Sequence, residues 1–109
     1  MTLWEERAAR NEALFREVNE HVRSLSDQFS SGSESIALVC ECSRDDCVER
    51  LHVAVAVYED VRAHARRFII APGQDDGDFE RVVERSSGYL VVEKEGAAGR
   101  IAQHTDPRS

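Results

Sequence analysis

Residues 35–47, SIALVCECSRDDC, place a strand pattern directly before a cluster that contains all three cysteines of the chain. From Ile36 to Cys40 the residues that recur at every second position are apolar, which is the periodicity of a half-buried β-strand. Residues 43–46 include two aspartates, which favour turns because their side chains bond to the nearby backbone. We therefore expect a strand over 36–42 and a turn over 43–46.

The cysteine spacing, C-x-C-x4-C, suits a metal ion. Positions i and i+2 of a strand point to the same face, so Cys40 and Cys42 converge, and the turn returns Cys47 to them. A structural zinc site places thiolates about 2.3 Å from one ion in a tetrahedral arrangement. The spacing therefore predicts a zinc knuckle with three thiolates. The candidates for a fourth ligand are His52, shortly after the last cysteine, and His64, on the next predicted helix.

Two other interpretations of the cysteines stay open. They can be three small buried hydrophobic side chains, since free cysteine is among the most buried residue types. They can also form a redox-responsive site, which requires a lowered thiol pKa and a basic neighbour. Four acidic residues within 41–49 oppose thiolate formation unless a cation is present, and a divalent ion supplies the largest local charge. Zinc binding is therefore the preferred interpretation, and a thiol- or metal-responsive regulator is the alternative.

Residues 3–28 predict one long helix. Apolar side chains recur seven residues apart in two series offset by four, with charged residues between them. One interpretation is an amphipathic helix that packs on its own domain. The other is a seam that pairs the helix with a second copy of the chain or with another protein, because a lone helix is only marginally stable in water. The candidate interaction residues are Phe15, Val18, Val22 and Leu25.

A serine-rich stretch, 30–35, follows this helix and predicts a linker. The linker separates an N-terminal helical arm from a small domain that carries the cysteine knuckle. The expected organisation is an arm over 1–29, a small α+β domain over 36–95, and a short helix or tail over 96–109.

The remaining pattern predicts an α+β fold in which a small mixed or antiparallel sheet follows the long helix. Short helices are expected to cover one face of this sheet. The predicted core includes Phe68, Tyr89 and Val91. The expected strands are 36–42, 50–55, 68–71 and 88–94, and the expected short helices are 56–66 and 78–86.

Charge and hydropathy exclude several kinds of partner. The formal net charge is −7, and neither the arm nor the rest of the chain is basic, so we expect no nucleic-acid partner. No apolar run approaches twenty residues, so no membrane span is expected. The N-terminus has no apolar signal region and the cysteine count is odd, which together predict a cytoplasmic protein with reduced thiols.

The sequence does not predict an enzyme. Residues 72–78, PGQDDGD, contain two glycines but lack the lysine and the order of a phosphate-binding loop. The acids of this segment could hold a hard cation, but the glutamate at the twelfth position of a calcium loop is missing. A hydrolytic zinc centre would use fewer thiolates and keep a water position open. We therefore expect a non-enzymatic interaction module, regulatory or adaptor in character, that pairs with itself or a partner protein.

Most of the chain between residues 4 and 95 resembles a family of short, uncharacterised bacterial proteins of the actinobacterial type. The similar segments are RNEALFREVNE in the first helix, the CxC-x4-C knuckle, YEDVR, RFIIAPGQ and VVERSSGYLVVEK. The resemblance implies no assigned activity. It departs at Gln74, where the family has histidine, and at Ser86, where histidine is frequent. If the missing histidine is the family's fourth ligand, this chain has lost or replaced it.

Overall fold

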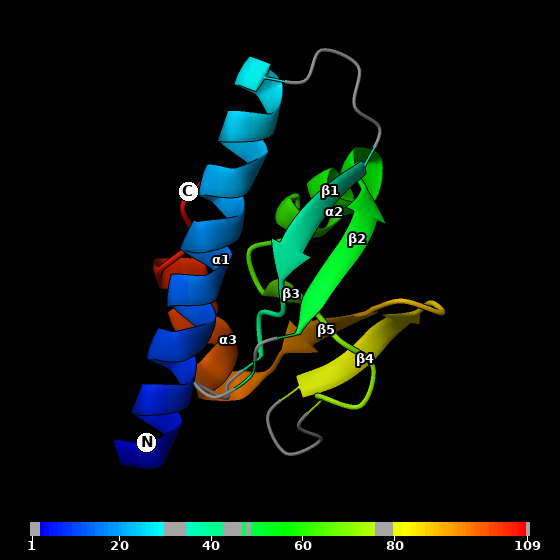
Figure 1. Ribbon diagram of the computed structural model, residues 1–109. Coiled ribbons are helices and arrows are strands. Elements are labelled where there is room, and N and C mark those ends of the chain that lie inside the picture. Colours follow the sequence, from blue (N-terminus) through cyan, green and yellow to red (C-terminus); the bar gives the residue numbers. More distant parts are fainter. Residues whose placement is uncertain (1–2, 30–34, 43–46, 48, 76–79, 109) are drawn as a thin grey trace.

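The computed structural model describes residues 3–29, 35–42, 47, 49–75 and 80–108, apart from the side chains of 4–5 and 26–29. The N-terminal helix α1 (Leu3–Phe29) runs along one flank of a molecule whose longest dimension is 43 Å (Figure 1). It contacts strand β1 (Ser35–Val39) and the C-terminal helix α3 (Gly96–His104). The long helix predicted for 3–28 is confirmed.

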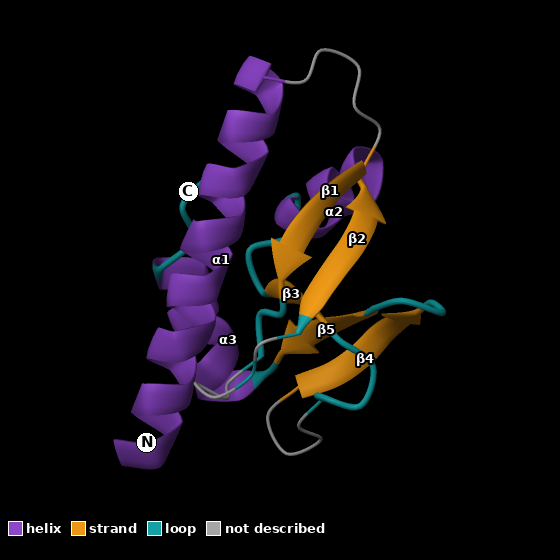
Figure 2. Cartoon of the chain, viewed as in Figure 1, coloured by secondary structure: helices purple, strands orange, loops and turns teal. Residues whose placement is uncertain are grey.

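Two small antiparallel sheets make up the β structure. In the first, β1 pairs with β2 (Arg50–Ala54), and Leu38 lies opposite Leu51. Buried and exposed residues alternate along both strands, as the period-2 pattern predicted. Helix α2 (Val55–Arg62) follows β2 directly and lies behind this hairpin in Figure 2. The boundary predicted between strand and helix near residue 55 is therefore confirmed.

The second sheet has the strand order β3-β5-β4. Its members are β3 (Arg67–Ile70), β4 (Glu80–Arg85) and β5 (Leu90–Lys94), all antiparallel to their neighbours. The register shifts between Val82 and Glu84, which marks a bulge in β4. The central strand β5 is nearly all buried, as expected of a strand with neighbours on both sides.

Two predictions about this region are wrong. The segment 78–86 was expected to be a helix, but residues 80–85 form β4. The adjacent valines Val82 and Val83 favour a strand, and β5 offers an edge with which the segment pairs on both sides of the bulge. The predicted strands also belong to two sheets rather than one, because β1 pairs with β2 whereas β3 pairs with β5.

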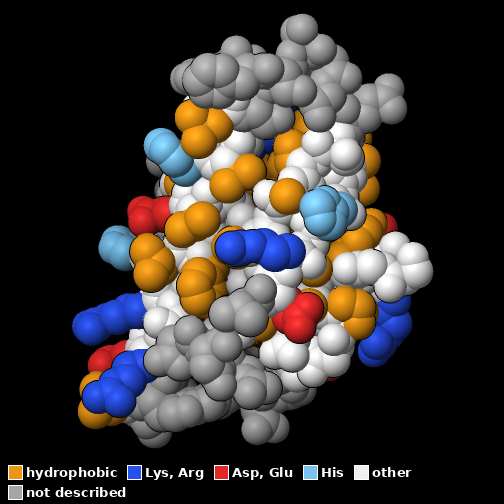
Figure 3. Space-filling model, in the orientation of Figure 1, with side chains coloured by type: hydrophobic (Ala, Val, Ile, Leu, Met, Phe, Trp, Pro, Cys, Tyr) orange, Lys and Arg blue, Asp and Glu red, His pale blue; other side chains and the backbone are white. Residues whose placement is uncertain are grey.

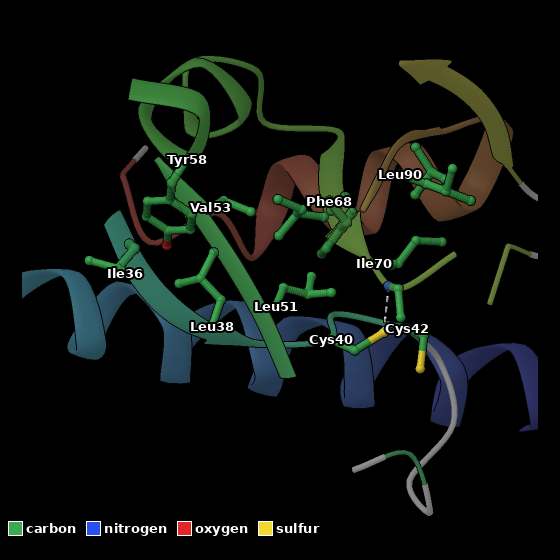
Figure 4. Close-up of a cluster of buried hydrophobic side chains, with 14 residues drawn as sticks. Ile36, Leu38, Cys40, Cys42, Leu51, Val53, Tyr58, Phe68, Ile70 and Leu90 are labelled. Carbon is green, nitrogen blue, oxygen red and sulfur yellow. Dashed lines mark hydrogen bonds between the residues drawn. The ribbon is translucent and has the colours of Figure 1, made fainter. Parts of the chain in front are cut away.

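The hydrophobic core lies between the two sheets and the helices. Tyr58 from α2 and Phe68 from β3 are buried in it, together with side chains from both sheets, and Tyr58 lies beside Ile36 at one end of the cluster (Figure 4). Of the predicted core residues, Phe68 and Val91 are buried, and Tyr89 is half-buried against the cluster. The α+β fold class is thus confirmed.

Helix α1 attaches to the body through a polar face. Its buried residues are Ala9, Glu12, Arg16 and Asn19, spaced so that they share one side of the helix. The predicted interaction residues lie elsewhere: Val18 and Leu25 are 39% and 41% exposed, whereas Phe15 and Val22 are half-buried. Val22 packs against the core cluster.

Candidate metal centre

The three cysteines come together in space. The Sγ atoms of Cys40, Cys42 and Cys47 all lie within 4.8 Å of one another. Three thiolates at about 2.3 Å from one ion and at tetrahedral angles would lie about 3.8 Å apart, so a small contraction of the cluster would suit zinc. Cys40 and Cys42 are buried and Cys47 is half-buried, so the cluster has one side near the surface. The convergence predicted from the CxC-x4-C spacing is confirmed.

The CxC segment bridges the two sheets. The backbone N–H of Cys40 donates to the carbonyl of Glu49, which precedes β2, over 3.2 Å. The next N–H along the chain, that of Glu41, donates to the carbonyl of Ile69 in β3 over 2.9 Å. The two cysteines therefore stand where the chain leaves one sheet and touches the other. Figure 4 shows them at one end of the core.

A turn after β3 supports the sulfur of Cys40. The N–H of Ala71 donates to Cys40 Sγ over 3.2 Å, drawn as a dashed line in Figure 4. Ala71 opens a turn that closes when the N–H of Gln74 donates to its carbonyl. Pro72 and Gly73 occupy the two central positions, and Gly73 has a φ of +85°, which favours glycine. The turn thus directs a backbone donor at a candidate ligand, as outer groups do in metal–thiolate sites.

The thiol of Cys40 is not a ready nucleophile. A hydrogen bond with Cys42, together with burial, raises the pKa of Cys40 above its ordinary range, and the Ala71 N–H only partly opposes this. Without a cation this sulfur therefore carries its proton at neutral pH. A divalent ion would displace the proton and supply the charge that the buried site lacks.

The residue between the two buried cysteines is a fully buried carboxylate. Glu41 accepts hydrogen bonds from Asn19 Nδ2 at 2.6 Å, from the N–H of Ile69 at 2.9 Å and from Arg62 at 3.1 Å. Both partners of the Arg62–Glu41 ion pair are almost completely inaccessible. A buried carboxylate is tolerated only when it is paired and hydrogen-bonded in this way. Through these hydrogen bonds Glu41 connects α1, α2 and β3 to the CxC segment.

Asn19 extends this attachment to the edge of the first sheet. Its Oδ1 accepts from the N–H of Val39 at 2.8 Å, and its Nδ2 donates to the Val39 carbonyl at 2.9 Å. A single buried amide thus satisfies both backbone groups of a residue at the end of β1.

A second buried polar cluster lies nearby. Lys94 of β5 donates to the carboxylates of Glu12 and Glu80, and all three side chains are buried. Burial raises the pKa of Glu12 to about 7; Lys94 opposes the rise, and Glu80 and Cys42 add to it. Two ionised carboxylates facing one ammonium would carry a net negative charge in a buried place, which agrees with the direction of the Glu12 pKa shift.

Neither candidate histidine joins the cysteines. Within the described residues the metal-binding group contains only the three sulfurs. His52 lies on the exposed face of β2, opposite the face that buries its neighbours Leu51 and Val53. His64 is exposed just beyond α2, beside a hollow that Asp60, Arg67 and Glu84 also line. The predicted turn 43–46, with its two aspartates, lies outside the described residues.

Sequence reasoning missed the buried polar residues around the cysteines. Glu12, Arg16 and Asn19 are spaced four and three residues apart, which is a helical stripe, but a polar stripe ordinarily faces solvent. Their partners lie far along the chain: Arg16 donates to the carbonyls of Ala65 and Ala102 at 2.7 and 2.6 Å. The helical spacing of Glu12, Arg16 and Asn19 is the one feature of the sequence that could have indicated that they share a buried face of α1.

No protein-family model, curated protein or solved structure matches the chain. The resemblance drawn from the sequence segments therefore stays an expectation, while its cysteine knuckle is consistent with the cluster of three sulfurs. Among the helices in the described part of the chain, none has the length and apolar content that a bilayer crossing requires.

Proposed function

We propose that this protein is a zinc-stapled protein-interaction module, regulatory or adaptor in character, in which Cys40, Cys42 and Cys47 hold a structural zinc ion. One observation carries the proposal: three sulfurs converge on the segment that bridges the two sheets. Three thiolates are a common donor set for structural zinc, with a non-cysteine ligand in the fourth position.

The ion would act on the fold rather than on a substrate. It would join the segment that follows β1 to Cys47, and through the Ala71 N–H it would stabilise the turn after β3. In a chain of 109 residues, whose core is small, such a crosslink contributes a large share of stability. The interaction role is assigned to α1, because that helix bears the large exposed hydrophobic side chains of the described structure.

A thiol-responsive regulator is the second candidate. Cys47 is half-buried while its sulfur lies near both buried thiols, so an oxidant could reach one member of the cluster. Hydrogen peroxide would take two electrons from two thiols, forming one disulfide and two water molecules. The raised pKa of Cys40, caused first by its hydrogen bond with Cys42, makes it a poor initial nucleophile, so this role would begin at Cys47.

Cobalt(II) titration of the metal-free protein tests the zinc proposal. The wild type is expected to develop sulfur-to-cobalt charge-transfer absorption and the visible bands of a tetrahedral site. Serine at any of the three cysteine positions should weaken both signals strongly. His52→Ala and His64→Ala are matched controls and should keep them, because both side chains are exposed away from the sulfurs.

Wild-type protein that shows no cobalt–thiolate absorption would contradict the zinc proposal. Loss of the tetrahedral bands in His52→Ala alone would instead identify that histidine as the fourth ligand after a rearrangement. Peroxide that produces a disulfide in protein without bound metal would favour the thiol regulator.

A further inference from the structure

The outer face of α1 carries an apolar stripe. The large hydrophobic side chains that are exposed in the described residues all lie on this helix: Leu3, Leu14, Val18 and Leu25. Successive residues turn by about 100° around a helix, so these four positions fall within one narrow sector. In Figure 3 hydrophobic side chains gather along α1. The stripe lies well away from the buried Glu12 and Asn19, so the body of the molecule leaves it accessible.

The stripe has the geometry of a pairing seam. Residues 11, 14, 18, 21 and 25 alternate in steps of three and four, which are the a and d positions of a coiled coil. This register differs from the predicted seam, because Phe15 and Val22 now stand on its flank and turn partly toward the domain. Arg7, Asn11 and His21 occupy polar positions of the same seam, which would weaken the pairing but limit the registers open to it.

We propose that two copies of the chain associate through this stripe with their α1 helices antiparallel. This pairing rests on the interaction role proposed above for α1, and it names a second copy of the chain as the partner. It does not require bound metal. The two bodies would lie on the outer sides of the helix pair, since each packs on the opposite face of its own α1.

Charge complementarity favours a second copy and fixes the direction. Arg10 and Glu17 are exposed on the same flank of the stripe, seven residues apart, and neither has an ion pair within the described residues. In an antiparallel pair like flanks meet, so Arg10 of each copy would approach Glu17 of the other in two symmetric pairs. In a parallel pair Arg7 would face Arg7 across the seam, which is repulsive.

A groove beside the stripe could accept a side chain from the facing helix. It lies between α1 and α3, has a volume of about 530 Å³, and is lined by Ala13, Leu14 and Ile101 with Arg10 and Glu17 at its edge. A side chain from the facing helix could enter it between the two charged positions. The apolar floor and the charged edge together match the core and rim of an interface.

Sedimentation velocity of the reduced 109-residue chain in the presence of added zinc, over a concentration series, tests the proposal. The wild type is expected to show a reversible monomer–dimer equilibrium. Arg10→Glu and Glu17→Arg should each raise the dimer dissociation constant about tenfold, because two symmetric pairs become repulsive. The double variant should return close to the wild-type value. Val18→Glu should abolish the dimer, and Arg85→Glu, exposed on β4, should leave it unchanged.

Each other outcome overturns the inference. A wild type that stays monomeric at high micromolar concentration overturns self-association, and a dimer that survives Val18→Glu overturns the seam. Failure of the double charge exchange to restore the dimer overturns the antiparallel arrangement. Zinc per chain, measured on the same samples, keeps the two proposals separate: a zinc-bound monomer refutes only the pairing, and a metal-free dimer refutes only the zinc site.

Discussion

Asn19, in the middle of α1, donates a hydrogen bond of 2.6 Å to Glu41, the residue between the two buried cysteines. The longest helix is therefore linked to the candidate metal centre by a buried amide and a buried carboxylate. Since Glu41 also pairs with Arg62, a disturbance of the CxC segment would reach both α1 and α2. The link makes stability a sensitive readout of the site.

Asn19→Ala should lower the free energy of unfolding by about 3 kcal/mol. The substitution removes one hydrogen bond to the Glu41 carboxylate and the hydrogen bonds to both backbone groups of Val39, and these groups would stay buried. Urea unfolding measures the change. Ser24→Ala, at an exposed position on the same helix, is the control and should stay within about 0.5 kcal/mol. A loss of less than about 1 kcal/mol for Asn19→Ala would refute the described network.

Stability should fall as pH rises from about 5 to about 7. Burial raises the pKa of Glu12 from 4.5 to about 7, so in this window the folded chain holds a proton that the unfolded chain has released. The unfolded state is then favoured as pH increases, by up to about 3 kcal/mol at the upper end. The pKa of Lys94 is also raised: burial lowers it, but Glu12 and Glu80 outweigh burial, so its own effect on stability falls at alkaline pH.

Glu12→Gln separates this effect from titration of the cysteines. Glutamine mimics the protonated carboxyl and leaves Lys94 balanced by Glu80. Thermal unfolding at matched zinc concentrations should give the variant a flatter profile between pH 5 and 7 and at least wild-type stability at pH 8, as estimated from the same linkage. Parallel profiles for the two proteins would show that Glu12 does not titrate in this range.

Gly73→Ala should destabilise the turn that supports Cys40. The residue has a φ of +85°, where a side chain adds strain of about 1 kcal/mol even though no atom lies close to the added Cβ. Gly88→Ala is the matched control, since it has the same open surroundings without a left-handed φ. Chemical unfolding of both variants measures the difference. Equal stabilities would mean that the turn is not formed as described.

The sequence was sufficient to predict the features with local causes. Alternation predicted β1 and β2. The strand expected to run to residue 42 ends at Val39, however, so Cys40 and Cys42 converge just beyond the strand and not through its i, i+2 geometry. The segment of β4 was misread because Phe79, Val82 and Val83 fit one turn of helix as well as a strand, and only the presence of β5 decides between them. A short apolar segment can form a helix or a strand, and the presence of a free sheet edge for it to pair with decides which one forms.

The attachment of α1 could not be predicted, because its chemistry is non-local. Glu12, Arg16 and Asn19 are ordinary surface residues in any helical pattern, and each is buried here by a partner 20 to 89 residues away. The same effect hid the role of Glu41, which alternation assigned to the face opposite Cys40. Local periodicity shows which side of a helix is apolar, but not that the polar side is buried.

Zinc content of the purified wild type tests the central claim most directly. Protein prepared under reducing conditions and freed of loosely bound metal should contain about one zinc per chain by elemental analysis, as a three-thiolate site requires. Metal-free protein whose thiols have been alkylated should not take up zinc again. Wild-type protein with only trace amounts of any transition metal, and no uptake of added zinc, would contradict the account and leave the cysteines as buried thiols.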